Sequence, residues 1–347
     1  MNSPDPTSKP TAESHRIPTL DGWRGIAILM VLADHVFDRR FHYFYLFGQH
    51  GVAIFFVLSG FLITSRLLAE LDATGDLRLR RFYIRRFFRL MPCAWLYLLV
   101  VALVFHQHHG RNLGIIPSLL FFRNYHGGND FTGQFWTLSI EEQFYLVWPA
   151  TLLLFRRRAW IVAVLGCLIV CVWRLADWNY IHSIHPMQSQ RTQYQADTLL
   201  LGCLLALFIE HLRPFLRAWL ALPLLAALVA CIAYFDKIIP LHESLVIALL
   251  LGVTSSNPGS LLSRFLQLRW LVQIGLISYS IYVWQQFTKF PWGGPIYITA
   301  PALIAAALTI GYLSYTFVEN PMNRLGRTLS ERVIRQPQRK LQPPENL

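Results

Sequence analysis

The chain has 347 residues, of which 54% are hydrophobic and 14% are charged. The mean hydropathy of +0.39 excludes an ordinary soluble protein, and the amount of apolar sequence excludes a single anchor helix. The formal net charge of +12 is compatible with nucleic acid as a partner, but the placement of the basic residues favours membrane lipids and no nucleic acid. We therefore predict an all-α, polytopic membrane helix bundle.

Residues 1–16 are polar and rich in Pro, Ser and Thr, which predicts a disordered cytoplasmic tail. A transmembrane domain is expected over 17–321, and the short basic segment 322–347 is expected to be a second disordered cytoplasmic tail. About ten apolar segments long enough to span a membrane, or nearly so, lie at 17–37, 44–65, 91–106, 138–155, 159–175, 196–212, 218–235, 240–254, 270–290 and 298–318.

The basic residues support an even number of spans. With both termini in the cytoplasm, 22 of the 31 Lys and Arg residues fall in inside segments, seven fall in outside loops or at their edges, and two fall within spans. This bias follows the positive-inside rule and predicts a multi-pass membrane protein. No motif has rigid metal-ligand spacing, so we expect no metal.

The first apolar helix, 17–37, carries Arg24 near its start and His35 near its end. Eleven residues at about 100° each return to within roughly 20° of the same direction, about 16 Å farther along the axis. Ionisable groups on one face of a spanning helix usually face the bundle interior and mark function. The alternative is that Arg24 reaches the headgroups and His35 caps the helix at the outer interface.

Six arginines occur in the inside segment 78–89, RLRRFYIRRFFR, where a few would fix the topology. Arg85 and Arg89 share a helical face, and Arg86 with Arg89 forms an R-x-x-R pair. Guanidinium groups in this arrangement can bind phosphates of a ligand arriving from the cytoplasm. The alternative is an amphipathic helix that lies on anionic lipid.

Two consecutive carboxylates, Glu141 and Glu142, lie near the start of the apolar segment WTLSIEEQFYLVWP at 136–149. This segment is expected to enter from the outer side, which would place Glu141 at about the depth of His35. A carboxylate that orients an imidazole makes it a stronger general base. The alternative is that both glutamates stabilise the positive end of the helix dipole.

Six strings in a fixed order carry a resemblance to a known family. They are LDGWRGIAIL with His35, GVAIFFVLSGFLI, FYIRRFFRLMP, WTLSIEEQFYLVWP, ISYSIYVWQ and FVENP. Together they resemble the bacterial acyltransferase-three family of integral-membrane acyltransferases, over about residues 17–321. The resemblance implies that the chain lies in the bacterial inner membrane. The family's helix-one signature falls on Arg24 and His35, its R-x-x-R signature on Arg86 and Arg89, and its glutamate on Glu141.

The resemblance implies transfer of an acyl group, often acetyl, from cytoplasmic acyl-CoA to a hydroxyl of a carbohydrate or other glycosylated acceptor. Arg85, Arg86 and Arg89 would meet the phosphates of the donor, and Arg24 would guide it into the bundle. His35, assisted by Glu141, would remove the acceptor proton. Where family members often have tryptophan and histidine, this chain has Trp284 and Gln285.

Two other function classes fit the same composition. A proton-coupled secondary transporter of a small anion would use Arg24, His35 and the glutamates as a relay, but the two halves of the chain show no clear correspondence. A non-catalytic lipid-binding scaffold would need neither His35 nor Glu141.

Overall fold

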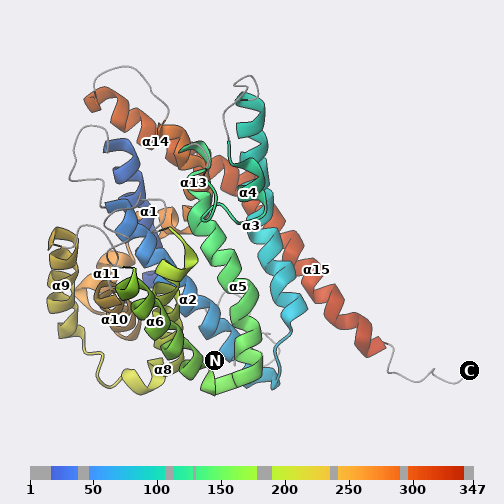
Figure 1. The fold of residues 1–347 in the computed structure, drawn as a ribbon, viewed down its shortest axis with the longest axis vertical. Coiled ribbons are helices and arrows are strands. Elements are labelled where there is room, and N and C mark those ends of the chain that lie inside the picture. Colours follow the sequence, from blue (N-terminus) through green and yellow to red (C-terminus); the bar gives the residue numbers. More distant parts are fainter. Residues whose placement is uncertain are drawn as a thin grey trace, which may run out of the picture.

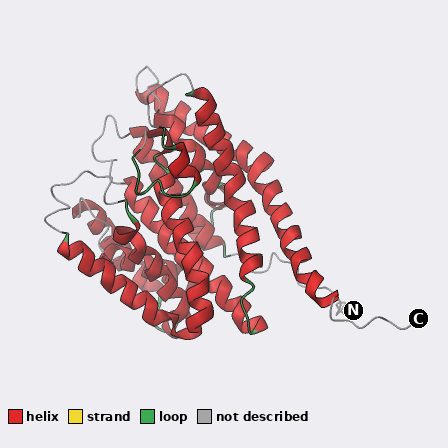
Figure 2. Ribbon diagram, turned by 45° about the vertical axis from the view of Figure 1, so that its right-hand side comes forward, coloured by secondary structure: helices red, strands yellow, loops and turns green. Residues whose placement is uncertain are grey.

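In the computed structural model the described residues are 17–37, 47–105, 113–127, 130–177, 190–234, 241–289 and 296–339. Throughout these ranges the regular structure is helical and contains no strand (Figure 2). The predicted all-α class is therefore confirmed for this part of the chain. The predicted tail at 1–16 lies outside the described residues.

The main helices form one bundle (Figure 1). They are α1 (Pro18–Phe37), α2 (Phe47–Thr74), α3 (Leu79–Val104), α4 (Ile115–Leu119), α5 (Phe135–Phe155), α6 (Ala159–Ala176), α8 (Thr192–Leu212), α9 (Ala221–Tyr234), α10 (Leu241–Ser256), α11 (Leu261–Leu266), α12 (Arg269–Leu276), α13 (Ser278–Trp284), α14 (Ile296–Ser314) and α15 (Asn320–Arg339). Short turns join several of them, including η3 (Arg156–Arg158) and η6 (Gln285–Lys289).

Five helical segments among the described residues are long and apolar enough to cross a membrane, fewer than the ten predicted. They are Phe47–Thr74, Leu79–Val104, Asp130–Ala176, Thr192–Leu212 and Thr299–Val333. Part of the difference is that Asp130–Ala176 contains both α5 and α6, which were predicted as separate spans. In addition, α9 and α10 are only 14 and 16 residues long and α1 carries three charged residues. The cytoplasmic placement of the termini stays a prediction.

Helix α2 lies at the centre of the packing, between α1 and α8. Its apolar sequence is interrupted by small residues at the crossings, which lets backbones approach closely. A Cβ atom built on Gly60 would lie 2.0 Å from the carbonyl oxygen of Leu199, and one built on Gly202 would lie 2.1 Å from that of Val57. The two glycines therefore set the contact between α2 and α8.

Replacing Gly202 with alanine is expected to lower the free energy of unfolding by about 1–3 kcal/mol, because the added methyl group meets backbone that cannot move aside. The measurement is the midpoint of thermal unfolding in detergent. Gly259→Ala is the matched control, since a Cβ atom there meets nothing within 4 Å. Equal midpoints for the two variants would show that the helices have room to separate.

The single span predicted at 270–290 is divided into α12, α13 and η6. Helix α12 crosses α1 closely, since a Cβ atom on Gly275 would lie 1.8 Å from the carbonyl oxygen of Asp21. The break turns the next segment, so that Tyr279 and Tyr282 of α13 reach the interior of the bundle, where both side chains are buried. Gln285 follows directly and is also buried.

The predicted disordered tail at 322–347 is wrong over 322–339, which belongs to α15. This helix packs along α3, and a Cβ atom on Gly326 would lie 2.6 Å from Cβ of Phe88. The less exposed residues Met322, Leu329 and Val333 recur at helical spacing. The basic composition hid this stripe. Residues 340–347 lie outside the described part.

Candidate active site

A cavity of about 270 Å³ lies between α1, α2, α3, α5 and α13. Five of the six predicted site residues line it: Arg24, Arg85, Arg86, Arg89 and Glu141. His35 does not line it. The wall is otherwise mostly apolar and aromatic, with Phe55, Phe56, Tyr145, Tyr279 and Tyr282 among the largest side chains.

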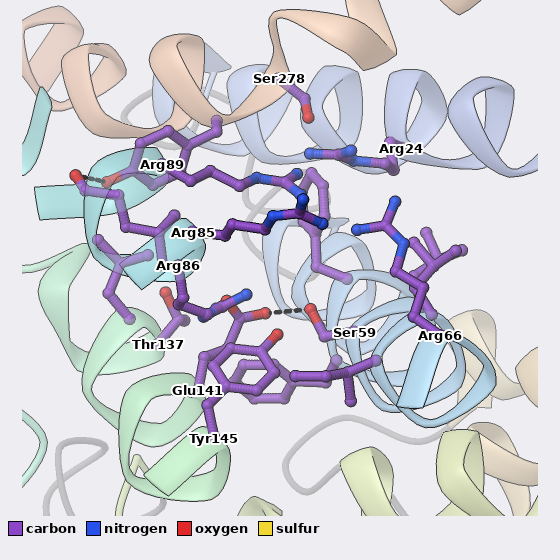
Figure 3. Close-up of a pocket in the computed structure, with 18 of the residues that line it drawn as sticks. Arg24, Ser59, Arg66, Arg85, Arg86, Arg89, Thr137, Glu141, Tyr145 and Ser278 are labelled. Atoms are coloured by element: carbon purple, nitrogen blue, oxygen red, sulfur yellow. Dashed lines mark hydrogen bonds and ion pairs between the residues drawn. The ribbon is translucent and has the colours of Figure 1, made fainter. Parts of the chain in front are cut away.

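The polar end of the cavity is strongly basic (Figure 3). Six arginines line it, from α1, α2 and α3, against the carboxylates of Glu70 and Glu141. The arginines are Arg24, Arg66, Arg81, Arg85, Arg86 and Arg89. This excess of positive charge in a confined space favours an anionic ligand.

Arg86 is held by its neighbours on α5. Its Nε atom donates to Glu142 Oε1 at 3.1 Å, and its Nη2 atom lies 3.0 Å from the same oxygen and 3.8 Å from Glu141 Oε2. The guanidinium carbon also lies 3.2 Å from the ring centre of Tyr145. All three charged side chains are only 15% exposed, so the group forms a largely buried ion cluster.

Glu141 also contacts α2, because Ser59 Oγ donates a hydrogen bond to Glu141 Oε1 at 2.5 Å. Figure 3 shows this bond at the floor of the cavity. The sequence analysis does not predict this contact of Ser59. Ser59 lines the cavity on α2, and its hydrogen bond holds the Glu141 carboxylate against that helix.

Arg85 points toward the C-terminal helix. Its Nε atom donates to Ser330 Oγ at 2.8 Å, and Nη2 lies 3.5 Å from Glu331 Oε1. Since Ser330 and Glu331 belong to α15, that helix positions one of the arginines that line the cavity.

His35 pairs with Gln285, through a hydrogen bond between its Nδ1 atom and Oε1 of the amide. An amide oxygen only accepts, so Nδ1 carries the proton and Nε2 is the basic nitrogen of neutral His35. Asp34 Oδ2 lies 3.8 Å from Nε2.

The predicted pairing of His35 with Glu141 is therefore wrong. Glu141 lines the cavity beside Arg86 and shares it with Arg24, eleven residues before His35 on α1. The physical reason is that Glu141 lies six residues, about 9 Å, inside α5, which carries it past the depth of the histidine. The catalytic roles given to His35 and Glu141 stay predictions.

The cavity nevertheless extends toward His35. Its lining on α2 runs from Glu70 to Val52, which is about 27 Å of helix. One turn beyond Val52, a Cβ atom on Gly48 would lie 2.5 Å from Asp34 Oδ2. On α13 the lining includes Tyr282, three residues before Gln285. The basic end and the histidine thus lie along one line of the bundle.

Known proteins give an independent comparison. A family model described as an acyltransferase domain matches residues 17–318. The peptidoglycan O-acetyltransferase OatA of Listeria monocytogenes is 31% identical over a match that covers 89% of this chain and 56% of OatA. YrhL of Bacillus subtilis, provisionally named a peptidoglycan O-acetyltransferase, is 32% identical over 93% of this chain and 57% of YrhL.

The chain spans a little over half the length of these relatives. No solved structure matches it. The family match covers nearly all of the described helices, including every residue that lines the cavity. The chain therefore belongs to the acyltransferase-three family.

Proposed function

We propose that the chain is a membrane O-acyltransferase that moves an acyl group, with acetyl as the first candidate, from acyl-CoA to a hydroxyl of a carbohydrate-containing acceptor. The observation that carries this proposal is the extended cavity, with arginines at one end and the His35 region beyond the other. The family match supports acyl transfer over the transporter alternative. The names of OatA and YrhL support a glycan acceptor.

The length of the cavity along the bundle suits a long acyl donor such as acyl-CoA. Arg24 and His35 are separated by about 16 Å along α1, and the acyl thioester of acyl-CoA sits at the end of a long pantetheine arm. Phosphates held at the basic end would let the arm extend along the apolar wall toward His35. A cavity of this size accepts the arm, and the adenosine would remain at the mouth.

The proposed reaction uses His35 as general base. Nε2 removes the proton of the acceptor hydroxyl while the oxygen attacks the thioester carbonyl carbon. The new C–O bond forms, the C–S bond breaks, and the CoA thiolate takes the proton back from the imidazolium. Asp34, 3.8 Å from Nε2, stabilises that imidazolium.

Gln285 has two proposed contributions. Its Oε1 atom fixes the tautomer of His35 by accepting from Nδ1. Its Nε2 atom is buried with no hydrogen-bond partner among the described residues, so it is available to donate to the carbonyl oxygen that gains negative charge.

Replacing Gln285 with leucine is expected to lower kcat about tenfold, the effect of losing about 1.4 kcal/mol from one well-placed hydrogen bond. KM for acyl-CoA is expected to stay near the wild-type value, because the basic end of the cavity is unchanged. Steady-state kinetics with purified protein measures both constants. A raised KM at unchanged kcat would place Gln285 in donor binding instead.

The function itself is tested in proteoliposomes with acetyl-labelled acetyl-CoA and soluble glycan strands from bacterial cell walls as acceptor. Mass spectrometry of the glycan is expected to show added acetyl groups that depend on both the protein and the donor. A label that stays on acetyl-CoA, or is released only as acetate, would contradict the proposal for this acceptor class.

A further inference from the structure

We propose that Arg24, Arg66 and Arg89 form a phosphate-binding site for the donor, with Arg66 as its third ligand, and that Arg86 instead serves to hold Glu141 and Glu142. The inference rests on the proposed function for the identity of the donor. The contacts of the six arginines that line the cavity support the site itself.

The three side chains come from three helices, α1, α2 and α3, and extend into the same part of the cavity (Figure 3). Arg24 and Arg66 are both near enough to Arg89 for their charges to repel it, and Arg24 repels Arg66 in the same way. Like charges gathered in a confined space are unfavourable unless an anion binds between them.

No carboxylate of the described residues forms a direct ion pair with this group, although Asp21, Glu141 and Glu319 attract it from farther away. None of the three arginines makes a hydrogen bond there or lies within 4.0 Å of a carboxylate oxygen, whereas the ion pairs of the cavity involve Arg81, Arg85 and Arg86. Glu319 is near Arg89, but its Oε2 atom accepts a hydrogen bond from Ser280 at 2.7 Å. The protein thus leaves these three cations for a ligand.

The other arginines of the cavity are already engaged. Arg81 lies 3.9 Å from Glu70, and Arg85 bonds Ser330 on α15. Arg86 has the two carboxylates of α5 and the ring of Tyr145. Withdrawing Arg86 from these groups would leave buried carboxylates without a cation, which opposes its use as a phosphate ligand.

The chemistry of the site favours a phosphate over a carboxylate ligand. Three guanidinium groups match the charge of a phosphate monoester or diphosphate, while a carboxylate would neutralise only one of them. Ser278 adds a hydroxyl, because its Oγ atom lines the cavity and is buried with no partner in the described part of the chain. Both the phosphates of acyl-CoA and an anionic lipid headgroup have this chemistry.

The test compares two donors with the same thioester, acetyl-CoA and S-acetyl-N-acetylcysteamine, which lacks phosphate. Arg66→Gln is expected to raise KM for acetyl-CoA about 10-fold to 100-fold and to leave the kinetics of the short donor unchanged. Arg157→Gln is the matched control, because this arginine lies outside the cavity and is 81% exposed in its pair with Asp72.

Binding is measured separately from turnover, as the shift in thermal midpoint caused by inorganic pyrophosphate in neutral detergent. Pyrophosphate is expected to stabilise the wild type and Arg157→Gln, and not Arg66→Gln. If these shifts appear while neither donor is turned over, the phosphate site stands and the proposed function fails. If Arg66→Gln impairs both donors equally, or is stabilised like the wild type, the site is overturned.

A lipid source is distinguished in nanodiscs. Acetyl-CoA is expected to have the same KM in phosphatidylcholine discs with and without phosphatidylglycerol. A KM that rises with phosphatidylglycerol in the wild type, and not in Arg66→Gln, would assign the site to a lipid headgroup and overturn its role in donor binding.

Discussion

Replacing His35 with alanine is expected to lower kcat for acyl transfer by about 10²-fold to 10⁴-fold, the range that a positioned general base contributes. The protein should still insert and fold, since His35 is a half-buried side chain at the end of α1. KM for acyl-CoA should stay near the wild-type value, because Arg24 lies about 16 Å from His35 along α1, in the cavity that Arg66 and Arg89 also line. Steady-state kinetics at saturating acceptor measures both constants.

The matched control for this variant is His211→Ala, which removes an exposed histidine on α8 outside the cavity. It is expected to keep wild-type turnover. Normal turnover in His35→Ala as well would show that His35 is not the general base and would favour a role for it at the membrane interface.

Replacing Arg86 with methionine is expected to have the largest structural effect of any single change at the basic end. Glu141 and Glu142 would remain as largely buried carboxylates without their cation, and breaking a buried ion pair in this way costs about 3–5 kcal/mol. A lower thermal midpoint in detergent and a lower yield of folded protein measure this effect.

A double variant separates structure from ligand binding. Arg86→Met with Glu142→Gln removes one of the stranded charges and is expected to recover part of the lost stability. Arg89→Met, which breaks no ion pair of the described residues, should keep a midpoint close to the wild type. A stable Arg86→Met protein whose only defect is a raised KM for acyl-CoA would instead make Arg86 a donor ligand.

The residues of the basic cavity were largely predictable from sequence. Arg86 and Arg89 stand at helical spacing beside more arginines than topology requires, and Glu141 lies in an apolar helix where a carboxylate needs a partner. Arg24 shares a helix with His35 but lies in the cavity while His35 does not. The spacing of residues along the sequence predicts which of them share a face of one helix. It does not predict which neighbouring helix packs against that face.

The hydrogen-bond and ion-pair partners of His35 and Glu141 were not predictable, because they depend on which helices pack together and at what depth. The relative depth of α1 and α5 in the bundle depends on the lengths of the connecting loops. It also depends on close helix crossings, such as that of α2 and α8 at Gly60 and Leu199. The difference between the expected and the observed depth places Glu141 beside Ser59 and Arg86 and not beside His35. Gln285 occupies the place beside His35, and the departure from the family pattern at this position was the available signal.

Two other features were hidden by a simpler explanation. Arg66 fits the positive-inside bias, so its place in the cavity needed the packing of α2 against α1 and α3. Helix α15 has a basic, polar composition that is typical of disordered tails, and its buried stripe includes Gly326 and Ser330 in place of large apolar side chains.

The most direct test is a cryo-electron microscopy structure of the protein in nanodiscs with a thioether analogue of acetyl-CoA. We expect phosphate density between Arg24, Arg66 and Arg89 and the pantetheine arm along the part of α2 that lines the cavity. We expect the acyl carbon near Nε2 of His35. Density that places the nucleotide at the His35 end, or the whole ligand outside the cavity, would contradict it.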